Sequence, residues 1–85
     1  MAPTYESVLD DTRRLIGEHL SDPIDVEPEH RFDTDLQLGS IEVMDLVADI
    51  EDHFDITIPL NDLPGMQTVG DTARHLLRLI ENSGR

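Results

Sequence analysis

Residues 40–54 read SIEVMDLVADIEDHF, and this stretch decides the fold of the 85-residue chain. When successive residues are placed at steps of about 100°, one face of roughly 100° of arc collects only apolar side chains. These side chains belong to Val43, Leu46, Val47, Ile50 and Phe54. The spacing predicts an amphipathic helix that begins at Ser40 and packs this face against a core.

The opposite side of the same helix mixes apolar with acidic residues. Its apolar members are Ile41, Met44 and Ala48, and the acids on or beside it are Glu42, Asp45, Asp49, Glu51 and Asp52. The spacing leaves two interpretations open. Single exposed apolar residues are normal on a solvated helix, whereas a small apolar strip among carboxylates is also typical of a docking face for a basic partner.

Two more amphipathic segments flank this helix. The apolar residues of each gather on one face, which predicts helices over about 5–20 and about 68–81. Thr68 is the expected N-cap of the last helix, and a short helical turn is expected at about 60–64. The predicted fold is all-α: a small bundle of three main helices plus one short helical turn, in a single domain over residues 1–85.

A long loop separates the first two predicted helices. Residues 21–39 show neither a helical nor a strand period. The apolar residues expected to hold this loop against the core are Ile24, Val26, Phe32, Leu36 and Leu38. An irregular stretch of this length in a compact domain is usually functional, so the loop is the first indication of a site.

The composition excludes several classes of function. Nineteen Asp and Glu residues stand against six Arg and no Lys, a formal charge of −13 that disfavours nucleic acid and anionic membranes as partners. The chain has no cysteine, so disulfides, thiolate metal sites and a cysteine nucleophile are excluded. Residues 1–6 show neither the basic nor the apolar region of a signal peptide, and no apolar run reaches membrane-spanning length. We therefore expect a cytoplasmic monomer without a secretion signal or membrane insertion.

No set of residues favours catalysis or metal binding. The four histidines, His19, His30, His53 and His75, contain no i, i+4 pair and have no cysteine beside them. A bundle this small also leaves little room for a catalytic pocket. We therefore expect neither metal ligands nor catalytic residues.

Ser40 is the strongest single candidate for a functional residue. It follows Gly39 at the junction of the long loop and the central helix. Taken alone, it is most simply interpreted as an N-cap serine. A phosphate esterified to its hydroxyl would instead lie at a helix N-terminus, where unpaired N–H groups and the helix dipole favour an anion. The position by itself leaves both interpretations open.

Four short motifs occur in a characteristic order. They are Asp-Leu at 35–36, Gly-Ser-Ile at 39–41, Glu-x-x-Phe-x-x-x-Ile-Pro at 51–59 and Thr-Val-Gly-Asp at 68–71. In this order and spacing they resemble the acyl carrier proteins, whose pattern has Asp-Ser-Leu at the second motif. The resemblance extends from Phe32 to Ile80.

The resemblance implies a carrier and not an enzyme. It implies that Ser40 receives 4′-phosphopantetheine from coenzyme A and that acyl groups are held as thioesters on the terminal thiol of this arm. The arm brings the sulfur, which explains how such a carrier can lack cysteine.

The resemblance also implies partners that grip the acidic second helix. The residues at docking positions are Ile41, Glu42, Met44, Asp45, Ala48, Glu51 and Asp52. The implied partners are a phosphopantetheinyl transferase, acyl- or aminoacyl-activating ligases, and downstream synthase or transferase enzymes with basic patches, in fatty acid or secondary metabolite biosynthesis. The docking positions coincide with the mixed face that the helical spacing had separated from the core face.

Three residues depart from the family pattern. Gly39 stands where the family usually has Asp, Gln37 where Gly is common, and Ile41 where Leu is usual. Gly39 removes a carboxylate beside the modification site, which favours a specialised carrier that serves a dedicated ligase or synthase. The alternatives are an aminoacyl or peptidyl carrier protein and a carrier-like helical adaptor that is never modified.

The distribution of charge predicts a stability that depends on salt. Between Phe32 and Ala73 the sequence has ten acidic residues and neither Lys nor Arg. We expect the melting temperature to rise with added NaCl or Mg²⁺, because ions screen the repulsion among these carboxylates. Thermal melts followed by circular dichroism at low and high salt measure the effect, and equal melting temperatures would contradict it.

Overall fold

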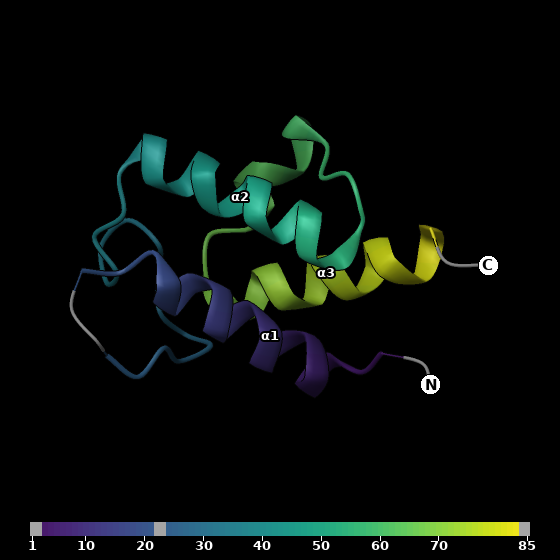
Figure 1. Cartoon of the computed structure of the whole chain (residues 1–85), viewed down its shortest axis with the longest axis horizontal. Coiled ribbons are helices and arrows are strands. Elements are labelled where there is room, and N and C mark those ends of the chain that lie inside the picture. Colours follow the sequence, from purple (N-terminus) through teal and green to yellow (C-terminus); the bar gives the residue numbers. More distant parts are fainter. Residues whose placement is uncertain (1–2, 22–23, 84–85) are drawn as a thin grey trace.

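The computed structural model describes residues 3–21 and 24–83, and it confirms the all-α fold class (Figure 1). The helices follow in the order α1 (Tyr5–Glu18), α2 (Ser40–Phe54), the 3₁₀ helix η1 (Leu60–Gly65) and α3 (Val69–Ser83). Within the described residues the backbone forms no strand and one isolated antiparallel bridge, between Arg31 and Thr68. No helix in this part of the chain combines the length and apolarity needed to cross a membrane.

Local hydrogen bonds set the ends of two helices. α1 ends at Glu18, two residues before the predicted end, because the N–H groups of His19 and Leu20 bond to carbonyls three residues back in a tighter turn. α3 begins at Val69, directly after its cap. The Thr68 hydroxyl accepts a hydrogen bond from the Asp71 N–H at 3.0 Å, as an N-cap side chain does.

All three α-helices contribute to one core. Its buried apolar residues are Val8, Leu9, Leu15 and Ile16 of α1, Leu46 and Ile50 of α2, Val69, Ala73 and Leu76 of α3, and Val26, Leu36, Leu38, Ile58 and Met66 of the connecting segments. From the predicted core face of α2, only Leu46 and Ile50 are fully buried. Val43, Val47 and Phe54 pack against the core with part of their surface exposed.

Backbone hydrogen bonds anchor the long loop to the segment before α3. The Phe32 N–H donates to the Gln67 carbonyl at 3.2 Å, and the Val69 N–H donates to the His30 carbonyl at 3.0 Å. The expectation that Ile24 helps to hold the loop was wrong, since its side chain is 47% exposed. The anchoring contacts fall further along the loop, where these backbone groups find partners.

Histidines form the ion pairs that join different elements in the described part of the chain. The arginine pairs, by contrast, connect residues no more than three positions apart. The joining pairs are His19–Asp49 (2.6 Å) and His53–Asp11 (3.4 Å) between the α1 and α2 regions, and His75–Asp62 (2.9 Å) between α3 and η1. Contacts between histidine and aspartate therefore link α1 to α2 and α3 to η1 in this part of the chain.

The backbone at Gln37 generates a prediction about stability. Its φ of 56° lies in the left-handed region, which costs a non-glycine residue roughly 1–2 kcal/mol, partly offset by the greater chain entropy that glycine loses on folding. We expect Gln37→Gly to raise the free energy of unfolding by about 0.5–1 kcal/mol. Denaturant titration of both proteins measures the difference.

Thr57→Gly is the matched control for this substitution. Thr57 is also exposed and irregular in conformation, but its φ is not positive. Glycine should therefore lower the stability at this position, because only the unfolded chain gains freedom. A loss of stability at both positions would contradict the interpretation of Gln37.

Candidate functional site

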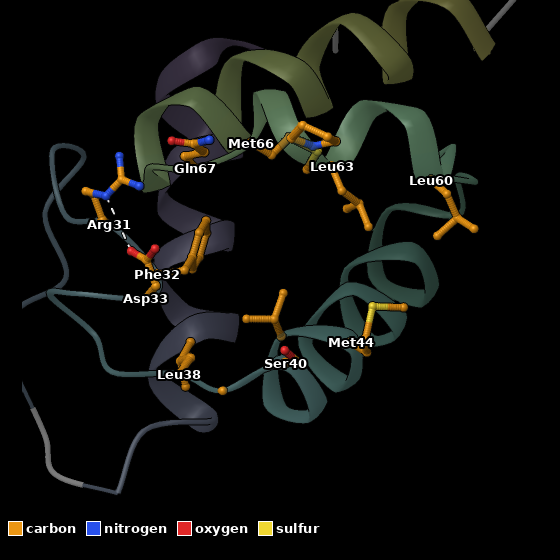
Figure 2. Close-up of a pocket in the computed structure, with 13 residues that line it drawn as sticks. Arg31, Phe32, Asp33, Leu38, Ser40, Met44, Leu60, Leu63, Met66 and Gln67 are labelled. Carbon is orange, nitrogen blue, oxygen red and sulfur yellow. Dashed lines mark hydrogen bonds and ion pairs between the residues drawn. The ribbon is translucent and has the colours of Figure 1, made fainter.

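Ser40 is the first residue of α2, and its side chain is exposed (Figure 2). The N-cap is Gly39, whose φ of −80° and ψ of 175° are extended, so Ser40 is not the capping serine considered from the sequence. Its hydroxyl forms no hydrogen bond to any other described residue. The site thus offers a free hydroxyl at a helix N-terminus, where an attached phosphate would meet unpaired backbone N–H groups.

An open groove of about 560 Å³ lies beside Ser40, between the first half of α2 and η1. In Figure 2 the Leu63 side chain points from η1 across the groove, and Ser40 lies at its edge on α2. The apolar residues that line the groove include Phe32, Leu38, Val43, Leu63 and Met66. A group attached to Ser40 can therefore contact an apolar surface of the same chain.

One end of this groove is polar. The Arg31 Nε atom lies 3.3 Å from Asp33 Oδ1, and Gln67 lies beside Arg31 (Figure 2). A hydrogen bond from the Thr34 N–H, followed by one from Arg31, lowers the pKa of the Asp33 carboxyl below its usual value. The Asp33 carboxylate lies against the Arg31 guanidinium and balances its charge at this end.

Two acidic residues at the predicted docking positions accept hydrogen bonds from backbone N–H groups, one at the start of α2 and one after its end. Glu42 Oε1 accepts a hydrogen bond from the Gly39 N–H at 2.6 Å, at the start of the helix. Glu51 is half-buried, and its Oε2 accepts one from the Ile58 N–H at 2.7 Å, in the segment after the helix. Both carboxylates are thus engaged within the protein.

The other predicted docking residues share the outer surface of α2. Ile41 and Met44 are 78% and 48% exposed, and Asp45, Ala48 and Asp52 are exposed as well. The structure therefore brings together two large apolar side chains and two carboxylates, Asp45 and Asp52, that pair with no cation among the described residues.

Leu60 is an exposed apolar residue that the sequence analysis missed. It begins η1, is 72% exposed and lines the groove. Figure 2 shows it near Met44, on the opposite wall. The available signal was the shortness of the turn at 60–65, since a six-residue helix has too little surface to bury all of its apolar side chains.

The histidines make contacts of other kinds. Three of them form the ion pairs between elements, and His30 Nδ1 accepts a hydrogen bond from the Glu27 N–H at 3.0 Å. Within residues 3–21 and 24–83, no group of three or more His, Asp or Glu side chains is placed to hold a metal ion.

Comparison with known proteins identifies the class. A family model described as a phosphopantetheine attachment site matches residues 10–76, which include Ser40 and the whole groove. The acyl carrier protein of Exiguobacterium sp. is 39% identical to this chain over 74 residues, which span 86% of this chain and 94% of that protein. The meromycolate extension acyl carrier proteins of Mycolicibacterium smegmatis and Mycobacterium leprae are 32% and 31% identical over 84 residues, 98% of this chain and 85% and 73% of theirs.

The helical fold and the family match together define a phosphopantetheine-dependent carrier. The chain belongs to the acyl carrier protein family, whose members carry acyl groups on phosphopantetheine. The cofactor of this class is therefore 4′-phosphopantetheine, and the free hydroxyl beside an apolar groove fits it. Acyl carrier proteins are generally non-catalytic, and they work with a phosphopantetheinyl transferase and with biosynthetic enzymes.

Proposed function

We propose that the chain carries acyl groups as thioesters on a 4′-phosphopantetheine arm attached to Ser40, and that the outer face of α2 presents them to partner enzymes. The chain itself catalyses no reaction in this proposal. It works as a monomer in the cytoplasm, where coenzyme A supplies the arm. The observation that carries the proposal is the free, exposed hydroxyl of Ser40 at the start of α2, beside an apolar groove.

The attachment step follows from the chemistry of coenzyme A. Ser40 Oγ attacks the phosphorus next to the pantetheine, a new O–P bond forms, and the bond to the other phosphate breaks. The products are the phosphodiester on Ser40 and 3′,5′-ADP, and a base of the transferase takes the serine proton. The phosphodiester anion then lies at the positive end of the α2 dipole, which stabilises it.

The groove supports an acyl cargo over an aminoacyl one. Phe32, Val43 and Leu63 offer a hydrocarbon chain an apolar contact surface, and each buried CH₂ group contributes about 0.8 kcal/mol. A charged amino group gains nothing from this surface. The aminoacyl and peptidyl carriers remain the second candidate, because Gly39 departs from the usual acyl carrier motif.

The outer face of α2 supports docking to enzymes with basic patches. Ile41 and Met44 provide apolar contact area, and the exposed carboxylates of Asp45 and Asp52 surround it. Charges of this kind accelerate encounter and select the partner more than they increase affinity. A dedicated ligase or synthase with a basic surface is the partner that this face fits.

Loading of the apo protein tests the attachment site. Incubation with coenzyme A and a panel of phosphopantetheinyl transferases should add one phosphopantetheine to the wild type and none to Ser40→Ala, as read by intact mass. Ser21→Ala, at another exposed serine, is the control and should load normally. An unmodified wild type with every transferase would refute the carrier function, and an adduct on Ser40→Ala would move the site.

Charge reversal tests the docking face. Asp45→Arg should lower kcat/KM for loading by partner enzymes about tenfold at low salt, because a repulsive charge then faces the basic partner. Helix content should stay unchanged, since Asp45 is exposed. Glu81→Arg, an exposed acid of α3, is the matched control. Equal rates for Asp45→Arg and the wild type at low salt would argue against this face.

A further inference from the structure

The start of α2 is held by a contact that the sequence did not indicate. The Gly39 N–H donates a hydrogen bond to Glu42 Oε1 at 2.6 Å. Glu42 is the third residue of the helix, so its side chain reaches back over the first turn and satisfies the N–H of the N-cap. The Leu38–Gly39 peptide, one residue before Ser40, is therefore bound to a carboxylate of the first turn.

The space above Gly39 is occupied by that carboxylate. A Cβ atom at residue 39 would lie 2.7 Å from Glu42 Oε1, closer than real Cβ contacts. The backbone itself does not require glycine, because φ of −80° and ψ of 175° suit any residue. Glycine leaves room for the Glu42 side chain in this conformation, and a Cβ atom would displace its flexible end.

An acidic side chain at residue 39 would conflict with Glu42 in a second way. Two carboxylates in contact repel each other, and each disfavours the ionised form of the other. A side chain at residue 39 and the backward-reaching Glu42 therefore compete for the same space in this geometry. Glycine at residue 39 removes this competition.

We infer that Glu42 is a positioning residue for the modification of Ser40, and that Gly39 is the partner substitution that permits it. The inference rests on the proposed attachment at Ser40. Glu42 fixes the Leu38–Gly39 peptide, and with it the direction in which the chain enters the first turn of α2, where Ser40 presents its hydroxyl. A transferase that acts on this chain must then recognise a serine that has no side chain at the preceding residue, Gly39. It must also recognise the Glu42 carboxylate in the first turn of α2.

Positioning and docking make different demands on Glu42. Positioning requires a hydrogen-bond acceptor, which the amide of glutamine also supplies, whereas docking to a basic partner requires negative charge. Misorientation of a nucleophile lowers kcat, by as much as about a hundredfold for a displacement near 1 Å. Loss of docking raises KM instead. The conservative variant Glu42→Gln therefore separates the two roles.

The experiment compares transferase kinetics of the full apo chain with coenzyme A as the donor. Glu42→Ala should lower kcat about tenfold or more with little change in KM, whereas Glu42→Gln should retain the wild-type kcat. Gly39→Ala should lower kcat like Glu42→Ala, because its Cβ displaces the Glu42 side chain. In the double variant the second substitution should add almost nothing, because both changes break one interaction.

Hydrogen exchange of the Gly39 amide supplies a readout that does not depend on the transferase. Exchange should accelerate about tenfold in Glu42→Ala and in Gly39→Ala, and remain slow in Glu42→Gln. Circular dichroism at the assay temperature checks that every variant is folded. Glu81→Ala, at an exposed acid far along α3, is the control for loss of one carboxylate.

Two results would overturn the inference while leaving the carrier function intact. One is a raised KM of equal size in Glu42→Gln and Glu42→Ala, which would assign Glu42 to docking. The other is additive loss of kcat in the double variant, which would show that residues 39 and 42 act independently. A wild type that no transferase modifies would instead refute the proposed attachment itself.

Discussion

The fold and the site both depend on the burial of two leucines at the end of the long loop. Leu36 and Leu38 are 6% and 8% exposed, whereas Ser40, two residues further on, is exposed. Each burial contributes roughly 1.5–3 kcal/mol, and Gln37 between the two leucines adopts a left-handed backbone conformation. The chain must then leave the core at Gly39, and this departure determines where α2 begins and where the serine hydroxyl emerges.

The acidic side chains between packed elements differ in their partners from those on the outer face of α2. Where elements pack, His19, His53 and His75 place a ring nitrogen against an aspartate. On the outer face of α2, by contrast, Asp45 and Asp52 have no cationic partner among the described residues. The carboxylates on the outer face of α2 therefore keep their mutual repulsion, since no cation of the described residues offsets it.

The sequence predicted the helices well because their signals are local. The apolar period of residues 40–54 survives in the structure, with Leu46 and Ile50 buried and Ile41 exposed. Burial at the edge of the predicted core face of α2 was less predictable. Val43 is partly exposed because the groove lies over it. The periodicity of the sequence cannot indicate a groove, because a groove depends on how the elements are placed relative to one another.

The details of the site could not be predicted for a different reason. A Gly-Ser pair before a helix allows either residue to be the N-cap, and the structure assigns the cap to Gly39. Glu42 stood on a face whose spacing suggested docking, yet its rotamer turns the carboxylate back to the backbone. Spacing places a side chain on a face of a helix, whereas its hydrogen-bond partner depends on rotamer and local space.

The first turn of α2 combines several roles in consecutive residues: Ser40 offers the hydroxyl, Ile41 faces outward, Glu42 holds the cap and Val43 lines the groove. The two departures from the family motif in this turn differ in kind. Isoleucine for leucine at 41 exchanges one exposed apolar side chain for another and leaves the turn unchanged. Glycine for aspartate at 39 removes a carboxylate beside the serine and leaves space that the Glu42 side chain occupies.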